Sequence, residues 1–151
     1  MAGIPQEAWV LIADGEKALF LRNIADEEDP HLVVIREEHQ DNPPDREQGT
    51  DAPGRMQDNG VRQRSAVAET DWHQLAKERF ASDLADILYR RAHKGEFDKI
   101  VLACAPNVLG DLRSALHKEV SDKVVGEVPK VLTNHPLDEI EKIVSDNLKA
   151  A

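Results

Sequence analysis

The sequence predicts an α/β domain in which a mixed β-sheet is flanked by helices, in the order βββ–loop–αβαβα. Two short apolar runs, at residues 9–13 and 100–105, are typical of strands buried on both faces. Three later segments carry apolar residues at helical spacing and alternate with strand-like runs. Together these patterns favour a sheet whose second half is built from parallel strands joined by right-handed crossovers.

The first third of the chain predicts three consecutive strands, at residues 9–13, 18–21 and 32–35. Asp14-Gly15 separates the first two and is a strong signal for a hairpin turn. The third run, LVVI, is rich in the β-branched residues that strands prefer. These segments are expected to form a three-stranded meander.

The second half predicts helices and strands in alternation. A first helix is expected from Thr70 or Asp71, either of which suits an N-cap, to Gly95, which suits a C′ position. A strand at 100–105 precedes a helix beginning at Pro106, and a strand at 124–132 contains Pro129, which favours a sheet edge or a bulge. A last helix is expected to begin within residues 133–136. The apolar stripes of the first and last helices are Leu75, Phe80, Leu84, Ile87 and Leu88, and Leu137, Ile140, Val144 and Leu148.

Length and composition indicate one globular domain spanning residues 1–151. Hydrophobic residues make up 40% and charged residues 32%, which excludes a disordered or membrane-embedded chain. No apolar run approaches the roughly 18 residues of a membrane helix, and no signal peptide is visible. A single cysteine suits a reducing compartment, so a cytoplasmic location is expected. The net charge of −10 argues against a broad basic surface, so any nucleic-acid contact must be local.

The sequence lacks the known motifs for metal binding and for phosphate-binding loops. The six histidines lack ligand spacing and there is no HExxH or CxxC, so no metal and no cofactor are expected. Phosphate-binding glycine loops are absent as well. Cys104 ends a predicted buried strand, where a core thiol is the simplest interpretation and a nucleophile the alternative.

A long segment at residues 38–69 is predicted to be a loop and to carry the function, because loops of this length in compact domains are functional or disordered. Arg55, Arg62 and Arg64 lie in a stretch, 53–67, whose only acid is Asp58. Guanidinium groups suit phosphate or carboxylate recognition. Two alternatives stay open. In the first, the loop is solvated and has no partner. In the second, its arginines pair with the acidic side chains of Glu37, Glu38 and Asp41.

Trp72 and His73 follow this segment at the expected entrance of the first helix. The simpler interpretation is that the tryptophan fastens the loop onto the domain by burial. The functional interpretation is a platform on which a nucleic-acid base stacks, with a histidine beside it.

The chain resembles the bacterial host-attachment protein family, named for a protein required for attachment to host cells. The resemblance rests on the loop pattern TDAPGR at 50–55, Gly60 and RSA at 64–66. It continues through ERFA at 78–81, FDKIVL at 97–102, PNVLGDLR at 106–113 and KVLTN at 130–134, and so covers nearly the whole chain. The family-marking positions are Gly54, Arg55, Gly60, Arg64 and Ser65.

That family in turn resembles the central domain of archaeal and eukaryotic peptide-chain release factors and of related ribosome-rescue factors. The resemblance implies the same fold and a link to translation. In release factors the loop carries a Gly-Gly-Gln motif, whereas here Gln57 and Gln63 lack the preceding glycine pair. Catalysis of peptidyl-tRNA hydrolysis by that mechanism is therefore not expected.

Three functions remain open from the sequence. The first is a binding module that contacts the ribosome or a tRNA and affects host attachment indirectly. The second is a hydrolase of peptidyl-tRNA or a related ester, with Gln57 or Gln63 positioning water. The third is a protein-interaction adaptor that needs no RNA. The expected binding loop consists of Gly54, Arg55, Gln57, Gly60, Arg62, Gln63, Arg64, Ser65, Trp72 and His73.

Overall fold

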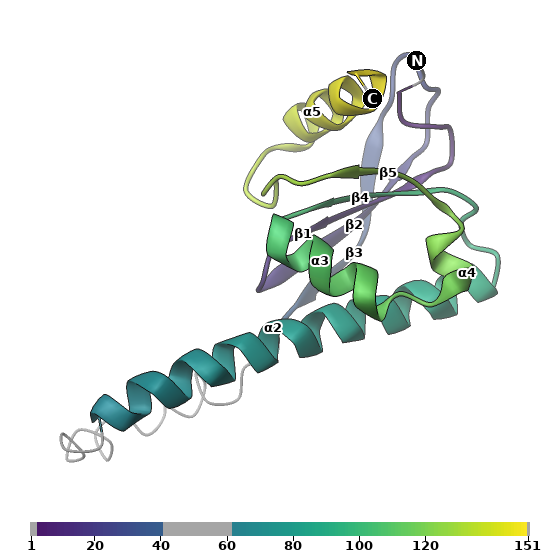
Figure 1. Cartoon of the computed structure of the whole chain (residues 1–151). Helices are drawn as coiled ribbons and strands as arrows, with labels where there is room; N and C mark the ends of the chain where they lie inside the picture. The colour runs from purple at the N-terminus through teal and green to yellow at the C-terminus, as the bar shows by residue number, and fades with distance from the viewer. Residues whose placement is uncertain (1–2, 41–61, 151) are drawn as a thin grey trace.

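A computed structural model describes residues 3–40 and 62–150, and for residues 62–73 it gives the course of the backbone (Figure 1). Strands and helices alternate in the second half of the chain, as predicted. The elements are β1 (Trp9–Ala13), β2 (Lys17–Asn23), β3 (Leu32–His39), α2 (Arg62–His93), β4 (Ile100–Cys104), α3 (Pro106–Ala115), α4 (Lys118–Ser121), β5 (Val124–Val128) and α5 (Leu137–Ala150).

The strands form one five-stranded mixed sheet in the order β3-β2-β1-β4-β5. β1 pairs antiparallel with β2, and β2 pairs antiparallel with β3. β4 pairs parallel with both β1 and β5. This arrangement confirms the predicted fold class, including the meander and the parallel second half.

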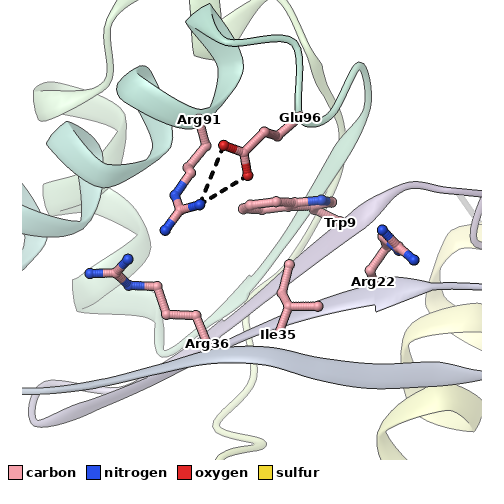
Figure 2. Close-up of a pocket in the computed structure, with 6 residues that line it drawn as sticks. All are labelled: Trp9, Arg22, Ile35, Arg36, Arg91 and Glu96. Carbon is pink, nitrogen blue, oxygen red and sulfur yellow. Dashed lines mark hydrogen bonds and ion pairs between the residues drawn. The ribbon is translucent and has the colours of Figure 1, made fainter.

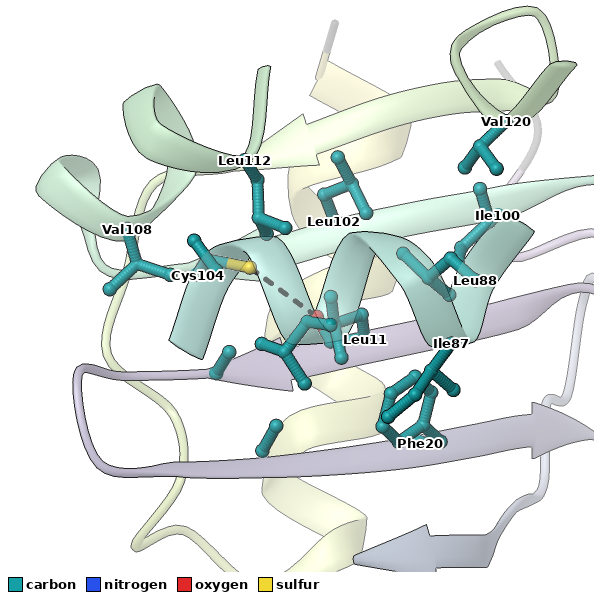
Figure 3. Close-up of a cluster of buried hydrophobic side chains, with 14 of the residues drawn as sticks. Leu11, Phe20, Ile87, Leu88, Ile100, Leu102, Cys104, Val108, Leu112 and Val120 are labelled. Carbon is teal, nitrogen blue, oxygen red and sulfur yellow. Dashed lines mark hydrogen bonds between the residues drawn. The ribbon is translucent and has the colours of Figure 1, made fainter. Parts of the chain in front are cut away.

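Helices cover the two faces of the sheet as separate layers (Figure 1). α2, α3 and α4 share one hydrophobic cluster with alternate residues of the central strands, among them Leu11 and Leu102 (Figure 3). α5 packs on the opposite face, where Ile140 and Val144 belong to a second hydrophobic cluster together with Val10 of β1. Because successive strand residues point to opposite faces, β1 and β4 are buried along their whole length. Their continuous apolar runs follow from this position between two helical layers.

The hairpin between β1 and β2 is closed by the side chain of Asp14. Its Oδ1 accepts hydrogen bonds from the backbone N–H groups of Glu16 and Lys17, both at 2.8 Å. The predicted turn at Asp14-Gly15 is therefore confirmed, and a carboxylate supplies the acceptor that it needs.

The predicted boundaries of the long loop were wrong at both ends. β3 continues to His39, and α2 begins at Arg62 rather than at Thr70 or Asp71, so the 38–69 segment includes strand and helix. The helix was missed although no glycine or proline occurs between Gly60 and Gly95. Six of residues 62–69 are arginine, glutamine, alanine or glutamate, which are good helix formers. Helix propensity thus outweighed the polar composition that suggested a loop.

The apolar stripe of α2 is confirmed except at its first member. Phe80, Leu84, Ile87 and Leu88 are buried, whereas Leu75 is 54% exposed. The predicted end of α2 is confirmed: Gly95 has a φ of +77°, and its N–H bonds to the carbonyl of Ala92 at 2.9 Å.

The end of the last strand was predicted four residues too late. β5 ends at Val128 rather than Leu132, because Pro129 cannot donate a ladder hydrogen bond. β5 is an edge strand, as the proline indicated, and its pairing with β4 shifts register between Ile100 and Val101. The short helix α4 was not predicted, since four residues carry no readable periodicity.

Candidate functional site

The ten residues of the predicted binding loop fall into two groups. Gly54, Arg55, Gln57 and Gly60 lie outside the described residues. The other six belong to α2, and their assignment to a loop, or to the entrance of a helix, was wrong. These six are Arg62, Gln63, Arg64 and Ser65 in its first turns and Trp72 and His73 further along.

α2 extends well beyond the part of the domain that it covers (Figure 1). Its 32 residues correspond to about 48 Å at 1.5 Å per residue. Within residues 74–93, where the burial of α2 is described, the buried side chains run from Ala76 to Ala92, and Figure 1 shows the helix continuing beyond the sheet toward Arg62. The stretch that begins at Arg62 therefore projects away from the sheet as a helical arm.

The start of α2 has a positive electrostatic character. Arg62 and Arg64 lie in its first turn, and no acidic residue accompanies them there. The helix dipole adds a partial positive charge at the same end.

In one alternative the loop arginines pair with nearby acidic residues. The structure describes two of those acids, Glu37 and Glu38, both in β3. Glu37 lies 3.0 Å from the Nε2 of His39, and Glu38 pairs with Arg36. Both carboxylates thus already have partners within their own strand. Asp41 and the loop arginine Arg55 lie outside the described residues, so that alternative stays a prediction.

A cavity of about 330 Å³ lies on the α2 face of the sheet (Figure 2). Its lining comes from four separate segments of the chain, so no local pattern in the sequence indicates it. The lining residues are Trp9 of β1, Arg22 of β2, Ile35 and Arg36 of β3, Arg91 of α2, and Glu96 of the following turn.

An irregularity in the pairing of β2 with β3 shapes this cavity. Leu21 pairs with Val34 and Phe20 pairs with Arg36, which leaves Ile35 as an extra residue on β3. Such a bulge interrupts the alternation of side chains between the two faces. As a result Ile35 and Arg36, although adjacent, both line the same cavity (Figure 2).

Each of the three arginines around the cavity has a carboxylate nearby. Arg91 Nη1 donates to both carboxylate oxygens of Glu96, at 3.0 and 3.3 Å. Arg36 pairs with Glu38 through its Nε, and Arg22 Nε lies 3.5 Å from Glu7. These contacts orient the guanidinium groups while leaving most of their five N–H donors without a carboxylate.

Cys104 does not have the environment of a nucleophile. The side chain is fully buried and its Sγ lies 3.9 Å from the carbonyl oxygen of Leu11 (Figure 3). Burial raises the pKa of the thiol to about 12, so the reactive thiolate is scarce at neutral pH. The interpretation as a core thiol is confirmed.

The histidines whose side chains are described do not gather into a metal site. Within residues 3–40 and 74–150, no three His, Cys, Asp or Glu side chains come together as potential ligands. His93 instead stacks on Tyr89 with a centroid distance of 5.6 Å, and the ring of His117 lies tilted against Tyr89 at 4.3 Å. None of the helices within the described ranges combines the length and apolar character needed to cross a bilayer.

The mixed sheet, its two helical layers and the long α2 form an α/β domain that is consistent with the release-factor type. The family described as Bacterial archaeo-eukaryotic release factor family 12 matches residues 7–144. The chain belongs to this family, which bears out the resemblance to release factors. A comparison with curated proteins finds no match. The likeness to host-attachment proteins stays an expectation from the sequence.

Proposed function

We propose that this protein is a cytoplasmic RNA-binding module that contacts the ribosome or a tRNA through residues 54–65 and the start of α2. Membership of a release-factor-like family supports a role related to translation. Beyond this general role, we propose the partner, which is the ribosome or a tRNA, and the surface that binds it.

The observation that carries the proposal is the helical arm of α2. It holds Arg62 and Arg64 at a helix N-terminus, away from the body of the domain (Figure 1). A helix N-terminus without acidic residues attracts phosphate groups through its dipole and its free N–H donors. Arg55, seven residues before the helix, adds a third guanidinium to the same part of the sequence.

The overall charge of −10 makes this contact local rather than general. A strongly acidic chain repels nucleic acid over most of its surface, so binding depends on the few cations that concentrate in one place. Removal of the arm arginines should therefore weaken binding strongly and make the remaining binding less dependent on salt.

The test is co-sedimentation of the full chain with ribosomes, and electrophoretic mobility of a tRNA, at several salt concentrations. Wild type is compared with Arg55→Ala/Arg62→Ala/Arg64→Ala. If each arginine faces one phosphate, the slope of log affinity against log salt falls by about 2 to 3 in the triple variant.

The matched control removes three cations from exposed positions on the body of the domain: Lys94→Ala/Lys130→Ala/Lys142→Ala. The control variant has the same net charge as the test variant and should keep wild-type binding. Equal loss in both variants, or no binding by wild type at low salt, refutes the proposal.

The same experiments separate the two alternatives. Hydrolysis of peptidyl-tRNA that disappears in Gln57→Ala/Gln63→Ala would favour the hydrolase. A protein partner retained after ribonuclease treatment would favour the adaptor. The role in attachment to host cells is proposed as indirect, through translation, and a strain carrying the triple arginine variant should show the same attachment defect as a deletion.

A further inference from the structure

We propose that the cavity lined by Trp9, Ile35 and three arginines binds a phosphate group (Figure 2). This inference does not rest on the RNA contact proposed for the arm of α2. The two sites use different residues, and separate variants test them.

The first argument is the concentration of guanidinium groups around one cavity. Arg22, Arg36 and Arg91 come from β2, β3 and α2, and they surround a single space in a protein whose net charge is −10. Figure 2 shows Arg36 and Arg91 on one side of Trp9 and Arg22 on the other. An oxyanion with several acceptor oxygens is the ligand that donors from separate directions recognise.

The second argument is an unsatisfied donor in the wall of the cavity. Trp9 is 4% exposed, and its indole Nε1 has no hydrogen-bond partner. Buried indole N–H groups usually find an acceptor, and a donor left without one is costly. In Figure 2 this nitrogen lies at the end of the ring nearest Arg22. A phosphate oxygen bound beside that arginine is the acceptor that we propose for this donor.

The third argument concerns the carboxylates that already accompany the arginines. All three pairs are partly exposed; the pair of Arg22 with Glu7 is the longest, with side chains that are 44% and 62% exposed. Ion pairs of this kind contribute little to stability. A phosphate can use the N–H donors that these pairs leave open, while the carboxylates orient the guanidinium groups.

Part of the cavity lining is apolar, which suits a small organic group attached to the phosphate. Trp9 and Ile35 supply apolar surface, and the volume of about 330 Å³ is near the lower end for ligand pockets. The phosphate could belong to a small phosphomonoester or to an RNA backbone. The recognition chemistry is the same, and experiment distinguishes the two sources.

The experiment follows the indole N–H signal of Trp9 by nuclear magnetic resonance of the ¹⁵N-labelled full chain. The Trp72→Phe variant, which leaves a single tryptophan, assigns the signal. The probes are inorganic phosphate, ribose 5-phosphate and a short single-stranded RNA, at constant low salt. We expect a saturable shift of the Trp9 signal with inorganic phosphate.

Three variants decide whether the cavity is responsible. Arg22→Gln/Arg36→Gln should lower phosphate affinity roughly tenfold or more, because two charge-assisted contacts are lost. Ile35→Trp keeps every charge and fills the space, so it should lower affinity similarly. Arg113→Gln removes an arginine of the same kind, paired with Glu127 away from the cavity, and should bind like wild type. Thermal unfolding confirms that each variant is folded.

A shift that saturates with wild type and is lost in the cavity variants supports the site. Tighter binding of ribose 5-phosphate than of RNA then identifies a small phosphorylated ligand, and the reverse order identifies an RNA backbone. No saturable shift with any of the three probes overturns the proposal. Equal affinity in wild type and in Arg22→Gln/Arg36→Gln overturns it as well.

Discussion

Asp14 connects two distant parts of the chain, and its replacement should destabilise the protein measurably. Its Oδ1 closes the hairpin between β1 and β2, and its Oδ2 accepts a 2.6 Å hydrogen bond from the hydroxyl of Thr133. Thr133 follows β5 and is 4% exposed. The contact therefore fastens the segment after β5 to the C-terminal end of β1, and Asp14→Ala removes it together with the turn.

The magnitude follows from the number and setting of these bonds. A hydrogen bond to a charged group contributes about 1.5–3 kcal/mol, and a buried hydroxyl left without a partner costs about 1–3 kcal/mol. Asp14 is only partly buried, so solvent compensates for part of the loss at the turn. We expect Asp14→Ala to lower the free energy of unfolding by about 2–4 kcal/mol, measured by urea denaturation.

The contribution of Asp14 should depend on pH in a defined direction. Partial burial alone would raise the pKa of its carboxyl group, but the hydrogen bonds from Thr133, Glu16 and Lys17 and the charge of Lys17 outweigh it. The pKa of Asp14 therefore lies below its ordinary value of 3.8. The stabilisation is complete above that ordinary value and is lost as the pH falls through the lower pKa of the folded state. The difference in stability between wild type and Asp14→Asn should narrow as the pH falls in that range.

A double-mutant cycle isolates the contact between Asp14 and Thr133. Thr133→Val keeps the shape of the side chain and removes only the hydroxyl donor. The coupling free energy between Asp14→Ala and Thr133→Val should be about 1–2 kcal/mol. A coupling below about 0.5 kcal/mol, or a stability difference independent of pH, would refute the reasoning.

Three further predictions concern the core and the end of α2. Leu84→Ala, at a fully buried position, should lower the free energy of unfolding by about 3–5 kcal/mol. Leu75→Ala, at an exposed position, should change it by no more than about 0.5 kcal/mol. Equal effects of the two substitutions in denaturant titrations would contradict the position of α2. Cys104 should react with a thiol reagent roughly a thousandfold more slowly in the native protein than in urea, and rapid native labelling would disprove its burial. Gly95→Ala should cost about 1–2 kcal/mol in the same titrations because of the positive φ, while an unchanged stability would show that the helix ends differently.

Much of the fold could be predicted because its signals are local. The apolar runs of β1 and β4 indicated strands buried on both faces, and Pro106 indicated where α3 begins. The turn at Asp14 followed from a side chain that can accept hydrogen bonds from the turn's own backbone, and the end of α2 followed from the positive φ that glycine adopts readily at Gly95. Such features depend on a few neighbouring residues, so the sequence displays them directly.

The start of α2 shows where local interpretation failed. Residues 62–69 carry polar side chains and little apolar surface, which resembles a loop, but their helix propensity continues a helix that the core already stabilises. Extension of an existing helix needs no new nucleus, so it is easier than the formation of an isolated helix. Amino-acid composition does not show that a stable helix will extend into a polar segment, so the start of α2 could not be predicted from it.

By itself, the sequence determined the class of the domain, the order of its elements, the likeness to release factors, and the arginines that mark the predicted RNA contact. The structure showed that Arg62 and Arg64 begin a projecting helix, and tertiary structure alone decided that Trp9, Arg22, Arg36 and Arg91 surround one cavity. The physical reason is that a helix and its caps depend on residues close in sequence. A cavity depends instead on strand register, on one bulge, and on the packing of α2 against the sheet, which bring together residues far apart in the chain.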